Sequence, residues 1–392
     1  MMDKLTNKVV LSDQVIKIER IEVYALSVAV ENGPVSSLGK LKTRNGLLVA
    51  LTAKDGVTGW GEIWCNFPQR GALGRMNLLQ DTIAERLLGL EFYEFDEVRP
   101  KLEADFSRMI THTGEYGPFN NCFAGIDTAL ADMAAKRHGQ PLSQFLAADT
   151  ASKIPAYASA PNVDDLEKSI GDLIQEGHTA AKLKIGFQPE KDIKLVDKFF
   201  KLANGRLDLF LDVNQNWNVN DAISIMDKIS NYPIGFLEEP LHAEAPLKDW
   251  AQLAQSISVP LAAGENISTR QKFINFIDQG GLEILQPDVA KYGGVSGAFT
   301  VGETAIKHEK RCFMHYMGTG LGLAASLHCL AAINGGGLME LDATPNPLRT
   351  ELGTLDLTLT NGFLSIPDGH GHGFTPDPIA LKEMTIASCE IN

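Results

Sequence analysis

Short apolar runs recur along the chain between residues 154 and 342, each long enough for one buried strand. They begin 24 to 28 residues apart, near Ile154, Ala180, Asp208, Gly235, Pro260, Ile284, Arg311 and Leu338. The gaps carry apolar positions at helical spacing, in residues 163–177, 190–203, 219–229, 247–257, 269–278, 295–308 and 322–333. Eight strands alternating with helices predict a (β/α)8 barrel. The last helix of the barrel is poorly marked, so we expect a modified barrel there.

The chain before this repeat has a different pattern. Strand-like alternation or apolar runs occupy residues 18–25, 46–52 and 58–64. Helical spacing follows in residues 124–139, where Ile126, Leu130 and Met133 lie on one face. A run of strands followed by helices predicts an α+β domain.

We therefore expect three parts. Residues 1–148 form an N-terminal α+β domain, residues 149–350 form the barrel, and residues 351–392 form a C-terminal segment. Residues 355–366 again read as strands, and we expect the C-terminal segment to return and pack on the N-terminal domain.

The composition is that of an ordinary globular protein, with 44% hydrophobic and 21% charged residues. A net charge of -14 argues against nucleic-acid binding. The five cysteines show no CxxC spacing, which favours reduced thiols in a cytoplasmic protein. The first residues lack the apolar core of a signal peptide, and no apolar run approaches the roughly 18 residues of a membrane helix. We expect a cytoplasmic protein that binds neither nucleic acid nor membrane.

Seven of the eight predicted strands end in or near a polar residue, at the face where barrel enzymes keep their active sites. Three consecutive strands end in acids: Asp212, then Glu238 and Glu239, then Glu265. One such acid means little, because strands often end in charge as they reach solvent. Three carboxylates predict an oxygen site suited to Mg²⁺, and no Cys/His grouping indicates zinc. Glu238 and Glu239 are neighbours, so only one can point into the barrel, and parity alone does not say which.

Basic groups flank these acids. Lys182 and Lys184 are two apart on one strand and face the same side, where mutual repulsion favours the loss of one proton. A neutral lysine is a competent base. His315 ends the seventh strand and Asp288 the sixth, and a carboxylate beside an imidazole fixes its tautomer. Glu340, on the eighth strand, is a candidate acid or hydrogen-bond partner of a substrate carboxylate. The alternatives are solvent-facing lysines, a structural histidine and a structural ion pair.

Taken together, these motifs resemble the enolase superfamily and, within it, the mandelate racemase subgroup. The likeness is carried by Lys182-Leu183-Lys184, Asp212-Val213-Asn214, Glu238-Glu239-Pro240, Gly264-Glu265-Asn266, Gln286-Pro287-Asp288, His315 and Glu340. The resemblance implies that the N-terminal domain caps the barrel. It also implies an Mg²⁺ site made by Asp212, Glu238 and Glu265.

The resemblance implies further roles. Lys184 is the base on one face of the substrate, while Lys182 neutralises the substrate carboxylate and lowers the pKa of Lys184. On the opposite face His315, paired with Asp288, is the acid or base. Glu340 hydrogen-bonds an oxygen of the substrate carboxylate, and Asn214 contacts a substrate hydroxyl.

These roles predict Mg²⁺-dependent abstraction of the α-proton of a hydroxy or sugar carboxylate, giving an enediolate. An acid-sugar dehydratase is the leading interpretation. Local likeness around residues 339–349 and 366–369 is closer to the sugar-acid enzymes of the subgroup, such as galactarolactone cycloisomerases. A racemase, an epimerase or a lactone cycloisomerase is the alternative, and a non-catalytic ligand-binding barrel is the alternative of another class. We expect a small carboxylate as substrate and a homo-oligomer.

The capping domain of this family supplies substrate specificity. The resemblance therefore implies that the loop 32–43 and the turn 64–67 contact the substrate. Lys40, Lys42 and Arg44 would add positive charge there.

Overall fold

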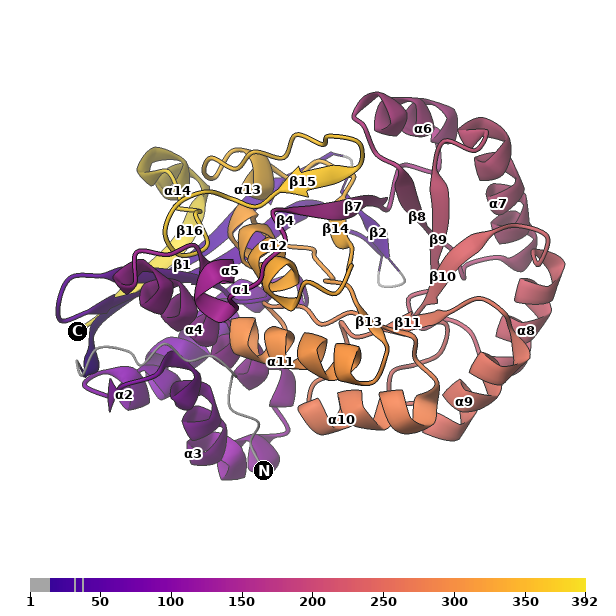
Figure 1. Ribbon diagram of the computed structural model, residues 1–392. Coiled ribbons are helices and arrows are strands. Elements are labelled where there is room, and N and C mark those ends of the chain that lie inside the picture. The colour runs from indigo at the N-terminus through magenta and orange to yellow at the C-terminus, as the bar shows by residue number, and fades with distance from the viewer. Residues whose placement is uncertain (1–14, 32, 37–38) are drawn as a thin grey trace.

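The computed structural model describes residues 15–31, 33–36 and 39–392. Eight parallel strands form one curved sheet, with helices α6 to α10 along its outer side (Figure 1). The strands are β7 (Lys153–Ser159), β8 (Ala180–Lys184), β9 (Asp208–Asp212), β10 (Ile234–Glu238), β11 (Leu261–Ala263), β12 (Ile284–Leu285), β13 (Arg311–Cys312) and β14 (Met339–Asp342). Their order is β14-β7-β8 and onward to β13, and a parallel bridge from Met314 to Met339 joins the two ends. The predicted barrel is confirmed.

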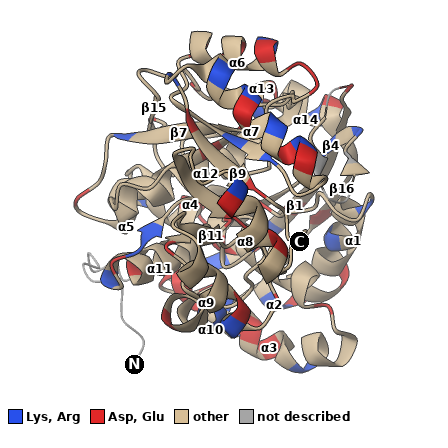
Figure 2. Cartoon of the chain, turned by 90° about the vertical axis from the view of Figure 1, so that its right-hand side faces the viewer, with Lys and Arg blue, Asp and Glu red and all other residues tan. Residues whose placement is uncertain are grey.

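Amphipathic helices alternate with these strands, as the apolar spacing predicts. They are α6 (Leu166–Gln175), α7 (Pro189–Ala203), α8 (Val219–Lys228), α9 (Leu247–Ser256), α10 (Arg270–Asn275) continued by η3 (Phe276–Gly280), α11 (Gly294–Lys307) and α12 (Gly320–Ile333). Only the four-residue α13 (Pro347–Thr350) follows β14, where the last helix is poorly marked in the sequence. Figure 2 shows acidic and basic positions intermingled on the outer helices. No helix in the described ranges is both long and apolar enough to cross a membrane.

A second, antiparallel sheet lies beside the barrel. Its main strands are β1 (Ile16–Ala29), β4 (Thr43–Ala53), β5 (Thr58–Glu62) and β16 (Thr385–Ile391), in the order β16-β1-β4-β5. The short strand β6 (Glu91–Phe92) also pairs with β1, and β2 (Val35–Ser36) pairs with β3 (Gly39–Lys40). The C-terminal strand thus joins the N-terminal sheet, next to β1 in Figure 1. The domain bounds at residues 148 and 350 stay predictions.

Helices pack on this sheet and on one another. They are α1 (Gly71–Leu78), η1 (Leu79–Ile83), α2 (Ala84–Leu87), η2 (Phe95–Glu97), α3 (Val98–Thr113), α4 (Tyr116–Arg137), α5 (Leu142–Leu146) and α14 (Pro378–Met384). Of these, α4, α1 and α14 contact the strands of the sheet directly. The helix predicted at residues 124–139 forms as the later part of α4, which is buried all round from Asn121 to Ala135. It lies between β5 and α11, so every face meets protein.

The strands expected in residues 355–366 form only in part. Only β15 (Phe363–Ser365) is a strand, and it pairs with β7 of the barrel. Leu355, Leu357 and Leu359 are half-buried against the core while the residues between them are exposed. The alternation of burial is real, but no neighbouring strand completes a ladder there.

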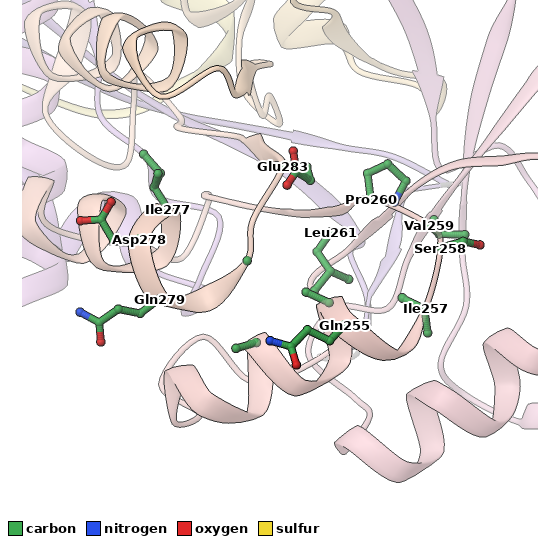
Figure 3. A pocket seen from close by; sticks show the side chains of 13 residues that line it. Gln255, Ile257, Ser258, Val259, Pro260, Leu261, Ile277, Asp278, Gln279 and Glu283 are labelled. Carbon is green, nitrogen blue, oxygen red and sulfur yellow. The ribbon is translucent and has the colours of Figure 1, made fainter.

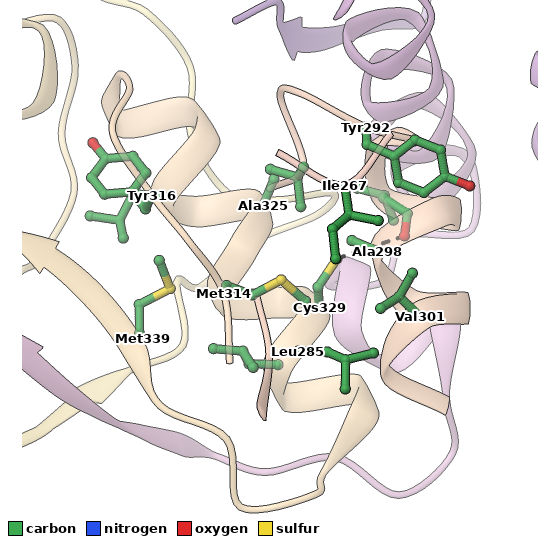
Figure 4. Packing of buried hydrophobic residues seen from close by; sticks show 14 of the residues in the cluster. Ile267, Leu285, Tyr292, Ala298, Val301, Met314, Tyr316, Ala325, Cys329 and Met339 are labelled. Carbon is green, nitrogen blue, oxygen red and sulfur yellow. Dashed lines mark hydrogen bonds between the residues drawn. The ribbon is translucent and has the colours of Figure 1, made fainter. Parts of the chain in front are cut away.

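Aromatic side chains fill the inside of the barrel below its catalytic end. The cluster consists of Tyr157, Ala180, Phe210, Phe236, Ala262, Ile284 and Phe313. The rings of Phe210 and Phe236 stack with centroids 4.3 Å apart. Outside the barrel, side chains of β12, α11 and α12 pack in a second cluster, among them Leu285, Val301 and Cys329 (Figure 4). The barrel is therefore a packed core that leaves only its strand ends for chemistry.

Two glycines of β5 allow the sheet to approach α4 closely. A Cβ at Gly59 would collide with the carbonyl oxygen of Ala129, and one at Gly61 with that of Gly125. Both obstacles are helix backbone, which cannot move aside as a side chain can.

We therefore expect Gly61→Ala to lower the free energy of unfolding by about 3 kcal/mol, the upper part of the range for overpacking. Gly171→Ala is the control, since Gly171 is exposed within α6 and no atom lies within 4 Å of the added Cβ. That control should stabilise the protein by about 0.5–1 kcal/mol, because alanine favours helix. Urea denaturation measures both variants, and equal stabilities would contradict the packing argument.

Candidate active site

The predicted site residues gather at the C-terminal ends of the barrel strands. The strand register places Lys184 beside Asp212, and Asp212 beside Glu238. All are largely buried, with Lys182, Asp212 and Glu238 each only 1% exposed. Because burial lowers the effective dielectric constant around these charged groups, the electrostatic interactions between them are strong.

Lys182 lies at the centre of a carboxylate cluster. Its Nζ is 2.7 Å from Glu238 Oε2, 2.8 Å from Glu340 Oε1 and 3.9 Å from Asp212 Oδ2. Burial disfavours the charged ammonium, but Glu238 and Glu340 outweigh it and hold the pKa of Lys182 well above its ordinary value. Lys182 is therefore a fixed positive charge beside Glu340, where a substrate carboxylate is expected.

Lys184 is held by two oxygens of the next strand and its loop. Its Nζ lies 2.8 Å from Asp212 Oδ2 and 2.8 Å from Asn214 Oδ1. Burial lowers the pKa of Lys184, and Lys182 lowers it too, but Asp212 outweighs both and the pKa is raised. In this arrangement the carboxylate of Asp212 favours the protonated form of Lys184, and the expected loss of a proton from the lysine pair stays a prediction.

His315 forms the expected pair with Asp288. Its Nδ1 lies 2.7 Å from Asp288 Oδ2, and its Nε2 lies 3.3 Å from Glu265 Oε2. Burial lowers the pKa of His315, but Glu265, Glu340 and Asp288 together raise it to about 9. These carboxylates therefore favour the protonated imidazole of His315, which is the form that can act as an acid.

Glu265 links the two sides of the site. It is close enough to His315, Lys291 and Lys184 for these three cations to hold its pKa below its usual range, although burial acts in the opposite direction. The imidazole of His315 and the ammonium of Lys184 thus share one carboxylate neighbour.

Lys291 belongs to the site but was missed from the sequence. Its Nζ is 2.9 Å from Glu265 Oε2, 2.9 Å from Asn266 Oδ1 and 4.7 Å from the ring centroid of Trp64. Asn266 in turn donates to both carboxylate oxygens of Glu239, at 3.0 and 2.9 Å. The signal was a lysine three residues after Asp288, on a turn where the Lys291 amide donates to the Asp288 carbonyl.

We expect Lys291→Met to lower the free energy of unfolding by about 3 kcal/mol, since it leaves a buried carboxylate short of a partner. The side chains of Lys291 and Glu265 are only 12% and 15% exposed. Lys310→Met is the control, because its pair with Glu283 is 22% and 48% exposed and should be worth less than about 1 kcal/mol. Guanidinium denaturation measures both, and matching losses would show that burial does not set the effect.

The donor types suit a hard divalent cation. Asp212, Glu238 and Glu265 are carboxylates on or just after three adjacent strands, and oxygen is the ligand that Mg²⁺ prefers. Burial together with the nearby Asp212 and Glu340 raises the pKa of Glu238 to about 7 even though Lys182 opposes this, so the cluster is rich in negative charge. Among the described residues no three acidic, histidine or cysteine side chains surround one point as ligands, because lysine ammonium groups contact each of these carboxylates. The ligand set stays a prediction.

The two adjacent glutamates have separate surroundings. Glu238 accepts hydrogen bonds from Lys182 and from Gln286 Nε2, the latter at 2.8 Å. Glu239 turns to Asn266, has φ of 40°, and burial together with Glu265 holds its pKa well above the ordinary value. Glu238 thus faces Lys182, whereas Glu239 faces Asn266, and the choice of Glu238 as metal ligand stays a prediction.

Part of the positive charge expected beside the capping loop is neutralised by an ion pair with the barrel. Arg44 is only 4% exposed and its Nη2 lies 2.5 Å from Asp342 Oδ2, so it links the two sheets. Lys42 is described, whereas residues 32, 37 and 38 of the loop, and the side chain of Lys40, lie outside the described residues.

A surface cavity of ≈ 370 Å³ lies elsewhere, between α9 and η3 (Figure 3). Its lining includes Pro260 and Leu261, which open β11, and Glu283, which precedes β12. These are the N-terminal ends of the strands. The cavity therefore faces away from the acid–base cluster.

Comparison with known proteins agrees with this geometry. Residues 20–147 match the mandelate racemase / muconate lactonizing enzyme N-terminal domain, and residues 165–380 match the enolase C-terminal domain-like family. A mandelate racemase/muconate lactonizing enzyme structure from Bordetella bronchiseptica is 35% identical with a TM-score of 0.88, covering 95% of this chain and 100% of that one.

Two characterised relatives act on sugar acids. D-galactarolactone cycloisomerase of Agrobacterium fabrum is 28% identical over 94% of this chain and 98% of that protein. L-talarate/galactarate dehydratase of Salmonella typhimurium is 28% identical over 88% of this chain and 83% of that protein. The chain is therefore an enzyme of the enolase superfamily and belongs to its mandelate racemase and muconate lactonizing enzyme group.

Proposed function

We propose that this enzyme abstracts the α-proton of a hydroxy or sugar carboxylate, with Mg²⁺ as cofactor, and that it is an acid-sugar dehydratase. The observation that carries the proposal is the arrangement of acid–base groups around Glu265. Lys184 is held by Asp212 and Asn214, and His315 lies 3.3 Å from Glu265, whose pKa Lys184 and His315 both lower. Two proton-transfer groups near one carboxylate-lined centre suit a reaction that removes one proton and delivers another.

Asp212, Glu238 and Glu265 would hold the Mg²⁺ ion. When bound, the ion would supply a Lewis acid for negative charge on the substrate carboxylate, and its ligands would include Asp212, the acid that favours the protonated form of Lys184. Lys182 and Glu340, 2.8 Å apart, would contact the same carboxylate oxygens from the barrel floor. A preformed set of charges at this position lowers the cost of the second negative charge in the enediolate.

The proton steps follow from the two bases. Neutral Lys184 takes the α-proton, and the electron pair of the C–H bond moves into the enediolate. His315 gives its proton to the β-hydroxyl, the C–O bond breaks, and water leaves. The enol then becomes a 2-keto acid. Asn214, beside Lys184, would orient a substrate hydroxyl.

A second candidate function is supported by the cycloisomerase relative, which spans nearly the whole chain. In that case His315 would protonate a lactone ring oxygen, or return a proton to carbon and give a stereoisomer. A non-catalytic barrel is not supported, since the characterised relatives are enzymes. Self-association stays a prediction.

Product analysis separates these functions. The enzyme is incubated with Mg²⁺ and a panel of aldonates, aldarates and their lactones, and products are identified by NMR. We expect a 2-keto acid, which semicarbazide also detects. A stereoisomer or a ring-opened isomer without a keto acid would assign the second function. Absence of both products and of α-proton exchange across the panel would contradict proton abstraction from these acids.

A further inference from the structure

We propose that the segment Glu62–Asn66 of the capping domain is a positioning element for His315 and Asp288, with Glu62 as its anchor. This inference rests on the proposed function only in treating His315 as the acid. The contacts themselves involve neither substrate nor metal.

Glu62 ends β5 and is directed at the N-terminal end of α12. Its side chain is 4% exposed and accepts hydrogen bonds from three donors. Oε1 accepts from the Thr319 amide at 2.9 Å, and Oε2 accepts from the Thr319 hydroxyl at 2.7 Å and the Gly322 amide at 3.0 Å. These amides open α12, where backbone N–H groups lack helical partners and favour a carboxylate. An acid of one domain thus caps a helix of the other.

The capped helix begins just after His315, and the loop between them is short. The carbonyl of Met317 in that loop accepts a hydrogen bond from Asn66 Nδ2 at 2.8 Å. The amide of Tyr316 donates to Glu340 Oε2 at 3.2 Å. Between His315 and α12, the chain is therefore held by Glu62 and Asn66 on one side and by Glu340 on the other.

The same segment also holds the partner of His315. The amide of Trp64 donates to the Ala290 carbonyl at 3.0 Å, and the Ala290 amide donates to Asp288 Oδ1 at 2.8 Å. Glu62, Trp64 and Asn66 are spaced two apart, so one extended stretch reaches both loops. Those loops meet in the 2.7 Å contact between His315 and Asp288.

The barrel side of the contact is shaped to receive Glu62. A Cβ at Gly322 would lie 2.5 Å from Glu62 Oε2, and one at Gly318 would collide with Oε1. Gly61, directly before Glu62, lets β5 lie against α4. Glycines on both sides of a buried acid indicate a contact that is built in by the sequence and is not incidental.

Lys184 provides the internal contrast. It is held by Asp212 and Asn214, which both belong to the barrel. Loosening the Glu62–Asn66 segment should therefore disturb the His315 side and leave the Lys184 side in place. A displacement of about 1 Å at a catalytic group can cost roughly 10²-fold in rate.

The first test needs no activity. Amide hydrogen exchange by mass spectrometry compares the full-length wild type with Glu62→Gln, which keeps the volume but places an NH₂ group against N–H donors. We expect exchange in peptides covering residues 313–322 and 288–291 to rise about tenfold, as loss of one to two hydrogen bonds implies. Peptides covering residues 180–186 should not change. Glu22→Gln is the control, because Glu22 lies in β1 and contacts Arg20 and Tyr24.

Unchanged exchange in residues 313–322 would overturn the proposal, and so would an equal rise in residues 180–186, which means general destabilisation. Asn66→Ala serves if Glu62→Gln does not fold, since it removes only the bond to Met317. It should speed exchange in the same loop, and no change would count equally against the proposal.

The second test uses galactarate and Mg²⁺. We expect Glu62→Gln to lower kcat about 10²-fold while KM and wash-out of the α-proton in D₂O stay within about twofold, because only the acid is misplaced. Parallel losses of kcat and wash-out would refute selective positioning of His315. An inactive wild type would count against the proposed substrate class alone, because the exchange experiment stands without it.

Discussion

Lys184→Met is expected to lower α-proton abstraction by about 10³-fold, within the range for removing a general base. Methionine keeps the length and apolar stem of the side chain but cannot take a proton. The other lysine of the same strand, Lys182, lies 3.9 Å from Asp212 and is already shared between Glu238 and Glu340. It is therefore poorly placed to replace Lys184 as the base.

Proton NMR in D₂O measures this directly, as loss of the α-proton signal of a substrate found in the product screen. His315→Asn is the informative partner variant. It should keep wash-out of the α-proton by Lys184 while losing dehydration, since the hydroxyl then has no acid.

Lys201→Met is the matched control, because Lys201 is 73% exposed on α7 and pairs with Asp197, far from the site. Its activity should equal that of the wild type. Wash-out within about tenfold of wild type in Lys184→Met would exclude Lys184 as the main base. Loss of wash-out in His315→Asn would instead make His315 the base for that proton.

The barrel could be predicted from the sequence because each βα unit carries its own signal. A short apolar run buries in the barrel wall, and the following amphipathic helix covers it, so local periodicity already describes the packing. Residues 121–135 and 355–362 lack this property. The first segment is buried on every side by elements far away in the chain, and the second has alternating burial without a strand to pair with.

The same reasoning explains the site. Strand ends are visible in sequence, and the topology brings them together, so Lys182 and Asp212 could be named, whereas the choice of Glu238 over Glu239 needed the family resemblance. Glu62 could not, because it meets Thr319 across 257 positions of the chain. The rise in the pKa of Lys184 could not be predicted either, since it depends on how close Asp212 lies to the ammonium group.

Removal of divalent metal is expected to abolish turnover, by at least about 10³-fold, and added Mg²⁺ should restore it. Abstraction of an α-proton beside a carboxylate places two negative charges on neighbouring oxygens, and a dication contributes several kcal/mol of stabilisation to such a state. Lys182 alone cannot supply this, because its charge already serves Glu238 and Glu340, at 2.7 and 2.8 Å. The measurement is activity after dialysis against EDTA, then titration with Mg²⁺.

A binding experiment tests the ligand set without relying on activity. Calorimetric titration of Mg²⁺ into Asp212→Asn should show affinity at least about tenfold weaker than wild type, since a charged ligand becomes neutral. Asp208→Asn is the matched control, because Asp208 lies at the other end of the same strand and is exposed. Full activity in EDTA would contradict the metal requirement. Equal affinities of the two variants would remove Asp212 from the ligand set, and the cation would then have to be held by Glu238 and Glu265 without the acid that contacts Lys184.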